Sequence, residues 1–349
     1  TTDAGTDARN YGDLEGLHEA RELFADVMGV RPQEVFVGGN SSLQLMYNLV
    51  AMGYMFGFPG SACPWSQVEK RKFLCPVPGY DRHFAITESF GIEMIPVPML
   101  EDGPDVDLIE ELVAADPAIK GMWCVPKFSN PDGYVYPLET CKRIAALRPA
   151  APDFALMWDN AYCIHEFDCD YVEFPDIISL CAKYGNADMV YEFASTSKVT
   201  FPGAGVGVMA SSADNIAYFS KLINIQTIGF DKINQLRHVL FLKDKAHTLA
   251  LMKQHAAILE AVVAGDALEA ETRTARHISS AAPGLDVLLA NPTWLGGGYG
   301  LISGTSFSGP YTAAAIASTF PVRLIRLPEN RGRIEARNRG AREARFETL

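Results

Sequence analysis

One lysine of the sequence stands where burial could make it reactive. Lys198 follows the apolar run 189–193 and lies among hydroxyl residues and glycines, in Ala194-Ser195-Thr196-Ser197 and Phe201-Pro202-Gly203-Ala204-Gly205. Partial burial of an amine lowers its pKa and makes it a usable nucleophile. The alternative is a solvated loop lysine, which is what we expect of Lys127.

Two further segments place polar groups where an apolar run ends or a helix begins. Asp159, in Trp158-Asp159-Asn160-Ala161-Tyr162, closes a run of residues expected to be buried. An unpaired carboxylate is costly there, so Asp159 needs a cationic partner, unless it is an ordinary cap or turn residue. Ser41 and Ser42 precede the helical run 43–56, and free backbone N–H groups at a helix N-terminus bind anions. A plain Ser N-cap is the alternative.

These positions together fit one ligand. It carries a phosphate for Ser41 and Ser42, an aldehyde for Lys198 and a basic ring nitrogen for Asp159. Pyridoxal 5'-phosphate (PLP) has all three groups, and its usual protein partners are a Schiff-base lysine and an acid at the pyridinium nitrogen. The sequence therefore predicts a PLP site.

Seven short apolar runs must position these side chains. They are residues 34–38, 72–77, 92–97, 121–125, 154–158, 189–193 and 205–209. Near-continuous apolar segments of this length are typical of buried strands in a largely parallel sheet. Amphipathic helices such as 107–115 and 137–147 lie between them, which predicts an α/β fold with helices on both faces. Ligands bind at the carboxyl ends of such strands, where the candidate residues stand.

The pattern changes after Ser211, where a helical stretch and later a Gly-rich turn, Gly296-Gly297-Gly298-Tyr299, follow. We therefore predict a large domain over residues 1–240, built on a seven-stranded, mostly parallel sheet. A smaller C-terminal α+β domain would cover residues 241–349. A chain of 349 residues is long enough for two domains.

Composition excludes several classes of protein. With 48% hydrophobic and 21% charged residues the chain is not disordered, and a net charge of −12 argues against a nucleic-acid binder. No apolar stretch is long enough for a membrane span, and the polar first residues do not resemble a signal peptide. The seven cysteines are odd in number and form no CxxC, so we expect reduced thiols in a cytoplasmic protein and no metal site.

Longer motifs resemble a known family. They are Val37–Leu43, Phe73–Phe84, Trp158–Tyr162, Phe193–Lys198 and Asp231–His238. These stretches resemble fold-type I PLP-dependent aminotransferases and are most similar to the aspartate aminotransferases of subgroup Ic. The resemblance extends nearly without a break from Asn10 to His238, and it implies the fold-type I large domain.

The resemblance also implies a role for each matching residue. Lys198 would form the Schiff base (aldimine) with PLP and move the proton between the substrate Cα and C4′ of the cofactor. Asp159 would keep the ring nitrogen protonated, and Tyr162 and Asn130 would bond the 3-oxygen of the ring. The other implied contacts are Tyr80 stacked on the ring, Asn40, Ser41, Ser42, Ser195 and Ser197 at the phosphate, and Tyr11 at the phosphate of a neighbouring subunit. The last contact implies a homodimer with shared active sites.

The substrate side departs more from the family. An arginine of the small domain should bind the substrate carboxylate, because a guanidinium fork matches it with two parallel bonds. Arg326 is the best match and Arg323 competes with it. Val206 stands where many members carry a phosphate-binding arginine, and Asp132 replaces the usual threonine of Asn-Pro-Thr-Gly. The resemblance fades after about residue 248, and family members carry several dozen residues ahead of the position of Tyr11.

The leading hypothesis is amino-group transfer between an L-amino acid of the aspartate or glutamate type and a 2-oxo acid. A second hypothesis keeps PLP but changes the bond that reacts, giving Cβ or Cγ elimination, replacement or carbon–carbon bond formation in specialised metabolism. Asp132 and the altered small domain motivate it. A third is a non-enzymatic binding domain, although a pure binder has no need of Lys198, Asp159, Asn130 and Tyr162 together.

Overall fold

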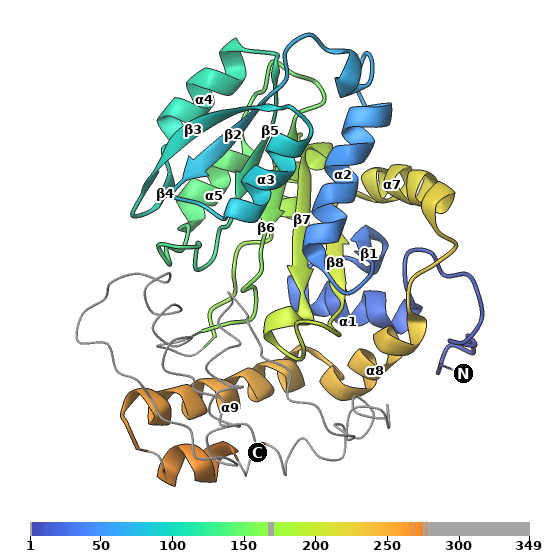
Figure 1. Ribbon diagram of the computed structural model, residues 1–349, viewed down its shortest axis with the longest axis vertical. Coiled ribbons are helices and arrows are strands. Elements are labelled where there is room, and N and C mark those ends of the chain that lie inside the picture. Colours follow the sequence, from blue (N-terminus) through green and yellow to red (C-terminus); the bar gives the residue numbers. More distant parts are fainter. Residues whose placement is uncertain (1, 167–170, 267, 275–276, 278–349) are drawn as a thin grey trace, which may run out of the picture.

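A mixed eight-stranded sheet is the centre of the molecule. The computed structural model of the chain describes residues 2–166, 171–266, 268–274 and 277 (Figure 1). The strand order is β1-β8-β7-β6-β5-β2-β3-β4, and the four pairings from β7 to β3 are parallel. β8 is antiparallel to both of its neighbours, and so is β4 to β3. The strands are β1 (Val35–Val37), β2 (Lys72–Val77), β3 (Glu93–Leu100), β4 (Gly103–Pro104), β5 (Ile119–Cys124), β6 (Ala155–Asp159), β7 (Val190–Ser195) and β8 (Gly207–Ala210).

All seven predicted strands are present, but the predicted strand count was wrong by one. The eighth strand, β4, has only two residues, Gly103 and Pro104, and it pairs with the end of β3. A two-residue Gly-Pro strand has no periodicity to detect in the sequence. β3 itself contains Pro96 and Pro98, which cannot donate hydrogen bonds. β4 pairs only with Met99 and Leu100 of β3. Pro96 and Pro98 therefore lie where β3 has no strand partner on that side, and no hydrogen bond is lost there.

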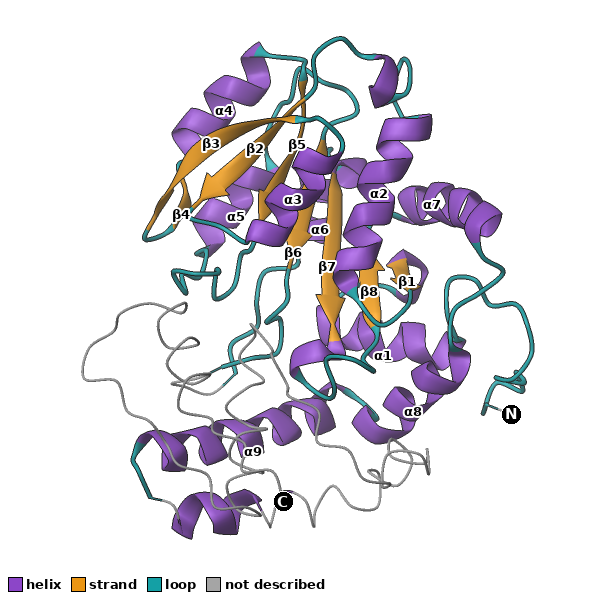
Figure 2. Cartoon of the chain, in the orientation of Figure 1, coloured by secondary structure: helices purple, strands orange, loops and turns teal. Residues whose placement is uncertain are grey.

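Helices cover both faces of the sheet (Figure 2). They are α1 (His18–Met28), α2 (Ser42–Phe56), α3 (Asp81–Ser89), α4 (Val106–Ala115), α5 (Leu138–Ala145), α6 (Ile177–Lys183), α7 (Ala213–Gln226), α8 (Lys232–Leu242) and α9 (Lys245–Val263). Side chains of α2, α3 and α7 form one apolar core against one face. Those of α1, α4, α5 and α6 form a larger core on the other face, which α8 and α9 extend. This layering is the predicted α/β architecture.

Alternation along each strand explains the two cores. In β7, Val190 and Ala194 belong to the larger core, whereas Tyr191 and Phe193 belong to the other. Successive side chains of a strand point to opposite faces, so a strand covered on both sides is mostly apolar, and in β7 the buried Glu192 is the exception. The candidate site residues follow or end the strands instead of lying within them.

Some of the predictions concern residues that the structure does not describe. The Gly-rich turn, Arg326, Arg323 and most of the predicted small domain fall outside the described residues. The main described element of that domain is α9, whose Leu251 and Met252 belong to the larger core, and the division at residue 240 stays a prediction. The described cysteines are free thiols, and all of them except Cys63 are buried. Within the described part of the chain, no helix is long and apolar enough to cross a membrane.

Candidate active site

A cavity of about 610 Å³ opens at the carboxyl ends of the parallel strands. Its lining includes most of the predicted site residues: Ser41, Ser42, Tyr80, Asn130, Asp159, Tyr162, Ser195, Ser197 and Lys198. They lie at or just after the carboxyl ends of β1, β2, β5, β6 and β7. Residues scattered from 41 to 198 meet because β7, β6, β5 and β2 are consecutive in the sheet and only β8 separates β1 from β7. The volume is within the usual range of small-molecule sites.

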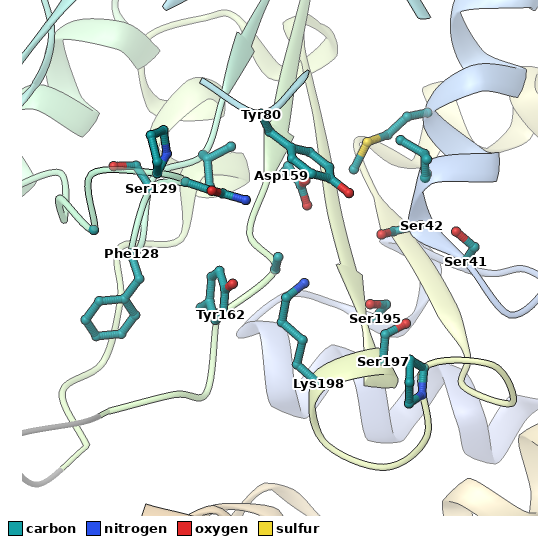
Figure 3. Close-up of a pocket in the computed structure, with 18 of the residues that line it drawn as sticks. Ser41, Ser42, Tyr80, Phe128, Ser129, Asp159, Tyr162, Ser195, Ser197 and Lys198 are labelled. Carbon is teal, nitrogen blue, oxygen red and sulfur yellow. The ribbon is translucent and has the colours of Figure 1, made fainter. Parts of the chain in front are cut away.

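Lys198 extends toward the centre of this cavity. It ends the short 3₁₀ turn Thr196–Lys198, directly after β7. Figure 3 shows its side chain between Tyr162 on one side and Ser195 and Ser197 on the other. The Nζ atom lies 4.9 Å from the centroid of the Tyr162 ring. Burial lowers the pKa of the Lys198 amine, and the negative charge of Asp159 offsets part of that shift. A lowered pKa leaves more of the amine neutral and nucleophilic.

Asp159 is buried at the end of β6, and only one of its two carboxylate oxygens has a hydrogen-bond partner among the described residues. His83 Nε2 lies 3.0 Å from Asp159 Oδ2. Because a carboxylate only accepts hydrogen bonds, the imidazole nitrogen is the donor. Among the described residues, Asp159 Oδ1 has no hydrogen-bond partner although it is buried. An orphaned carboxylate oxygen beside a cavity is costly unless a ligand donor meets it.

His83 is the functional neighbour that the sequence reasoning missed. It is almost fully buried in the first turn of α3 and stacks on Trp123, with ring centroids 4.4 Å apart and planes 9° from parallel. The ring of Tyr80, the residue that caps α3, meets it edge-on at 5.0 Å. Stacking fixes the imidazole plane and thereby aims Nε2 at Asp159. The only available signal was its place in the motif Phe73–Phe84, three residues after Tyr80.

The N-terminus of α2 lies at one side of the cavity and has the features of an anion-binding site. Ser41 is the N-cap residue, and its side chain makes no capping hydrogen bond, so the hydroxyl is available to a ligand. The loop before it is held against β8, because Gly38 N donates to Gly207 O and Gly207 N donates to Gly39 O, at 2.8 and 2.7 Å. Free N–H groups and the helix dipole at this point suit a phosphate.

Gly207 is expected to be irreplaceable for this side of the cavity. A Cβ at residue 207 would lie 2.6 Å from the Ser41 carbonyl carbon and 2.7 Å from Ser42 N. Both are backbone atoms of the anion site, so Gly207→Ala should displace it, at a cost of about 1–3 kcal/mol in unfolding free energy. It should also weaken PLP binding, measured by titration of absorbance. Gly203→Ala is the matched control because a Cβ at residue 203 meets nothing within 4 Å, and equal effects of the two changes would contradict this account.

Helix α8 explains the motif Asp231–His238, to which the sequence alone assigned no role. Asn234 Nδ2 donates to Gly205 O at 2.8 Å, and His238 Nε2 lies 2.9 Å from the Thr200 hydroxyl. His238 is completely buried, and burial lowers its pKa, so it is neutral at physiological pH. Since its Nδ1 donates to Asn234 O, the Thr200 hydroxyl donates to Nε2. These hydrogen bonds hold the loop at Thr200–Gly205, which follows Lys198, against α8.

Not every predicted residue is part of the cavity lining. The Asn40 amide donates to Gly203 O at 3.2 Å instead of facing the cavity. Tyr11 is 82% exposed, and Lys232 Nζ holds its carbonyl oxygen at 3.1 Å. The phosphate contacts expected of these two residues therefore stay predictions.

The expectation for Lys127 was wrong. Lys127 is 2% exposed, and its Nζ pairs with Glu166 Oε1 at 2.6 Å. Glu166, 39 residues away in the sequence, provides the negative charge that allows Lys127 to be buried, and no local pattern indicates this partner. A paired, buried ammonium is a poor nucleophile, so of these two lysines Lys198 is the better candidate for a reactive amine.

The residues present fit PLP. Lys198 is an amine of lowered pKa, Asp159 Oδ1 is a buried acceptor without a hydrogen-bond partner among the described residues, and the Ser41–Ser42 helix terminus in the same cavity is suited to an anion. Tyr80 can offer an aromatic face to the ring, and it too lines the cavity. Within the described residues, no group of three or more His, Cys, Asp or Glu side chains could hold a metal ion.

Comparison with known proteins agrees with this geometry. A family profile described as "Aspartate amino-transferase" matches residues 1–284. An aspartate aminotransferase of Corynebacterium glutamicum is 47% identical over 255 residues, which are 73% of this chain and 59% of that protein. A Mycolicibacterium smegmatis protein named as an aminotransferase is 51% identical over 251 residues, 72% of this chain and again 59% of that protein. The chain thus spans about three fifths of the length of these relatives.

Solved structures show the same fold. An aspartate transaminase from Corynebacterium glutamicum superposes with a TM-score of 0.72 at 44% identity, covering 77% of this chain and 65% of that one. An α-aminoadipate aminotransferase from Thermus thermophilus, complexed with N-(5'-phosphopyridoxyl)-L-leucine, superposes with a TM-score of 0.56 at 22% identity, covering 74% of this chain and 64% of that one. The second likeness supports the fold alone. The profile match covers most of the sequence, and the chain belongs to the aspartate aminotransferase family.

Proposed function

We propose that this protein is a PLP-dependent aminotransferase that moves an amino group between an L-amino acid of the aspartate or glutamate type and a 2-oxo acid. The observation that carries the proposal is that Lys198, the orphaned oxygen of Asp159 and the Ser41–Ser42 helix terminus surround one cavity. These are the three contacts that the aldehyde, ring nitrogen and phosphate of PLP require. Names of relatives with 47% and 51% identity support the same reaction class.

Bound PLP would supply an electron sink for the bond broken at the substrate Cα. Lys198 would hold the cofactor covalently and, once released by substrate, carry the proton between two carbon atoms as a general base and acid. The lowered pKa of its amine suits that task near neutral pH. Asp159, held by His83, would keep a proton on the ring nitrogen, while Tyr162 and Asn130 would bond the 3-oxygen of the ring.

Substrate recognition is proposed from the family and from chemistry. An acidic amino acid presents two carboxylates, and Arg326 is proposed to bind the α-carboxylate, with Arg323 as the competing candidate. Tyr11 is proposed to meet the phosphate of a second copy in a homodimer, which its 82% exposed ring would permit. A cytoplasmic location belongs to the same proposal.

One observation favours a second function. Asp132 lines the cavity and is exposed, so an extra negative charge faces the substrate space. The negative charge of Asp132 would repel the side-chain carboxylate of an acidic substrate, and this repulsion disfavours aspartate and glutamate. The alternative is a PLP enzyme of specialised metabolism that performs elimination or replacement at Cβ or Cγ, or forms a carbon–carbon bond.

A half-reaction distinguishes the two functions. The PLP-loaded protein is mixed with L-aspartate or L-glutamate without any 2-oxo acid, and the visible absorbance is followed. We expect the absorbance of the lysine-bound cofactor to be replaced by that of pyridoxamine phosphate, with one equivalent of 2-oxo acid released. Ammonia released with repeated turnover, or a visible band that neither amino acid changes, would reject the aminotransferase and favour the second function.

A further inference from the structure

A glutamate lies in the apolar core that covers one face of the sheet. Glu192 is in the middle of β7, is 2% exposed, and alternates with Val190 and Ala194, which belong to the larger core. Its neighbours in the sheet are Trp158 and Ala210. A carboxylate in such a place is rarely left without a cation, because the transfer of a charge out of water costs far more than that of a neutral group.

The contacts of Glu192 contain no cation. Its Oε1 accepts a hydrogen bond from Asn160 Nδ2 at 2.8 Å. Within the described part of the chain, Glu192 Oε2 and Asn160 Oδ1 are both buried without a hydrogen-bond partner, and no lysine, arginine or histidine forms an ion pair with Glu192. The titratable groups close enough to influence it electrostatically are Asp176, the N-cap residue of α6, and three buried thiols, Cys141 of α5, Cys163 after β6 and Cys181 of α6.

We propose that Glu192 is a neutral carboxylic acid that forms a two-bond pair with the Asn160 amide, and that this pair positions Asp159. In the pair, Asn160 Nδ2–H donates to Oε1 while the acid O–H at Oε2 donates to Asn160 Oδ1. One proton thus satisfies both orphaned oxygens and removes the buried charge. If Glu192 were ionised, Glu192 Oε2 and Asn160 Oδ1 would both stay without a hydrogen bond and the buried negative charge would stay without a cation.

The electrostatic surroundings agree with this assignment. Burial raises the pKa of Glu192 to about 8, the Asn160 hydrogen bond lowers it in part, and the charge of Asp176 raises it further. The thiols add no charge near neutral pH, because burial raises the pKa of each as well. The acid form of Glu192 therefore predominates below about pH 8.

The pair joins the two strands that carry the reactive groups. Asn160 directly follows Asp159, and its backbone N–H donates to Phe193 O of β7 at 2.8 Å. Its side chain holds Glu192 of the same strand, and β7 leads to Lys198. Asn160 is thus tied to β7 by backbone and side chain, which fixes the spacing between Asp159 and Lys198. The positioning role rests on the proposed function, whereas the neutral state of Glu192 does not.

The neutral state is tested in the full chain without PLP, by comparison of the natural protein with Glu192→Gln. Glutamine keeps the shape and can make both hydrogen bonds at every pH. Infrared difference spectra should show a buried carboxylic acid C=O band at pH 6 that Glu192→Gln lacks and that the exposed control Glu93→Gln retains. Absence of that band from the natural protein would overturn the proposal.

Stability against pH gives an independent readout. The pKa of Glu192 is about 8 when folded and is near the ordinary value of 4.5 when unfolded, so the folded state holds a proton that the unfolded state has released. Stability should therefore fall as pH rises from about 4.5 to about 8. The Tm of the natural protein should fall relative to that of Glu192→Gln by about 5 °C or more over this range. Parallel profiles for the two proteins would overturn the proposal.

Positioning is tested in the PLP-loaded protein. Asn160→Ala and Glu192→Leu should shift the pH at which the absorbance of bound cofactor changes by about one unit, and Glu192→Gln should restore the natural profile. If Glu192→Leu folds and shows the natural profile, the positioning role is wrong. If no variant and not even the natural protein binds PLP, the proposed function fails, while the infrared and Tm results still decide the state of Glu192.

Discussion

Replacement of Lys198 by alanine is expected to abolish covalent attachment of PLP and to lower the rate of amino-group transfer by about 10³-fold or more. Lys198 is the amine that extends into the cavity, and burial lowers its pKa. No other described residue of the lining is a lysine. Loss of this side chain removes both the covalent anchor and the group that carries the proton, so the two effects should appear together.

The change is measured by visible absorbance after PLP is added and by the single-turnover rate with L-aspartate. Lys221→Ala, which removes an exposed lysine from α7, is the control and should behave like the natural protein. If Lys198→Ala keeps both the visible band and a rate within tenfold of the natural one, Lys198 is not the reactive amine.

The second large effect is expected of Asp159→Asn. The amide keeps the size of Asp159 but has no charge with which to hold a proton on the ring nitrogen. We expect the single-turnover rate to fall by about 10²–10³-fold, the range seen when one preorganised electrostatic contact is removed from a reaction site. PLP should still attach to Lys198, because the aldehyde and the phosphate do not depend on Asp159.

The single-turnover rate and the amount of attached PLP are therefore measured separately. Asp132→Asn is the matched control, since Asp132 is a carboxylate that lines the same cavity but is exposed. It should change substrate preference more than the rate with a given substrate. Equal losses of rate in the two variants would show that general charge in the cavity, and not the buried carboxylate, is what matters.

Much of the site was predictable because its residues stand at strand ends. Lys198, Asp159 and Ser41 each follow a recognisable apolar run, and the rule that ligands bind at the carboxyl ends of parallel strands brings them together without any structure. Most strands were predictable because burial on both faces makes them largely apolar. β3 is exposed at most positions near the edge of the sheet but is still apolar in sequence, whereas β4, which has two residues, had no pattern to detect.

What escaped prediction depends on contacts between distant residues. His83 and Asp159 are 76 residues apart, and Lys127 and Glu166 are 39 apart. The sequence around either residue of such a pair does not indicate which distant residue will contact it. Glu192 is the clearest case, because one acid within an apolar run gives no sign of whether a cation, water or an amide will meet it. The structure supplies Asn160, and with it a reason for a buried acid.

The most direct test of the central claim is to find which side chain PLP modifies. The protein is incubated with PLP, reduced with borohydride to make the bond permanent, digested and mapped by mass spectrometry. We expect a single phosphopyridoxyl group on Lys198, and none on Lys127, whose amine is paired with Glu166. Modification of Lys127 or of exposed lysines in place of Lys198, or no modification at saturating PLP, would contradict this expectation.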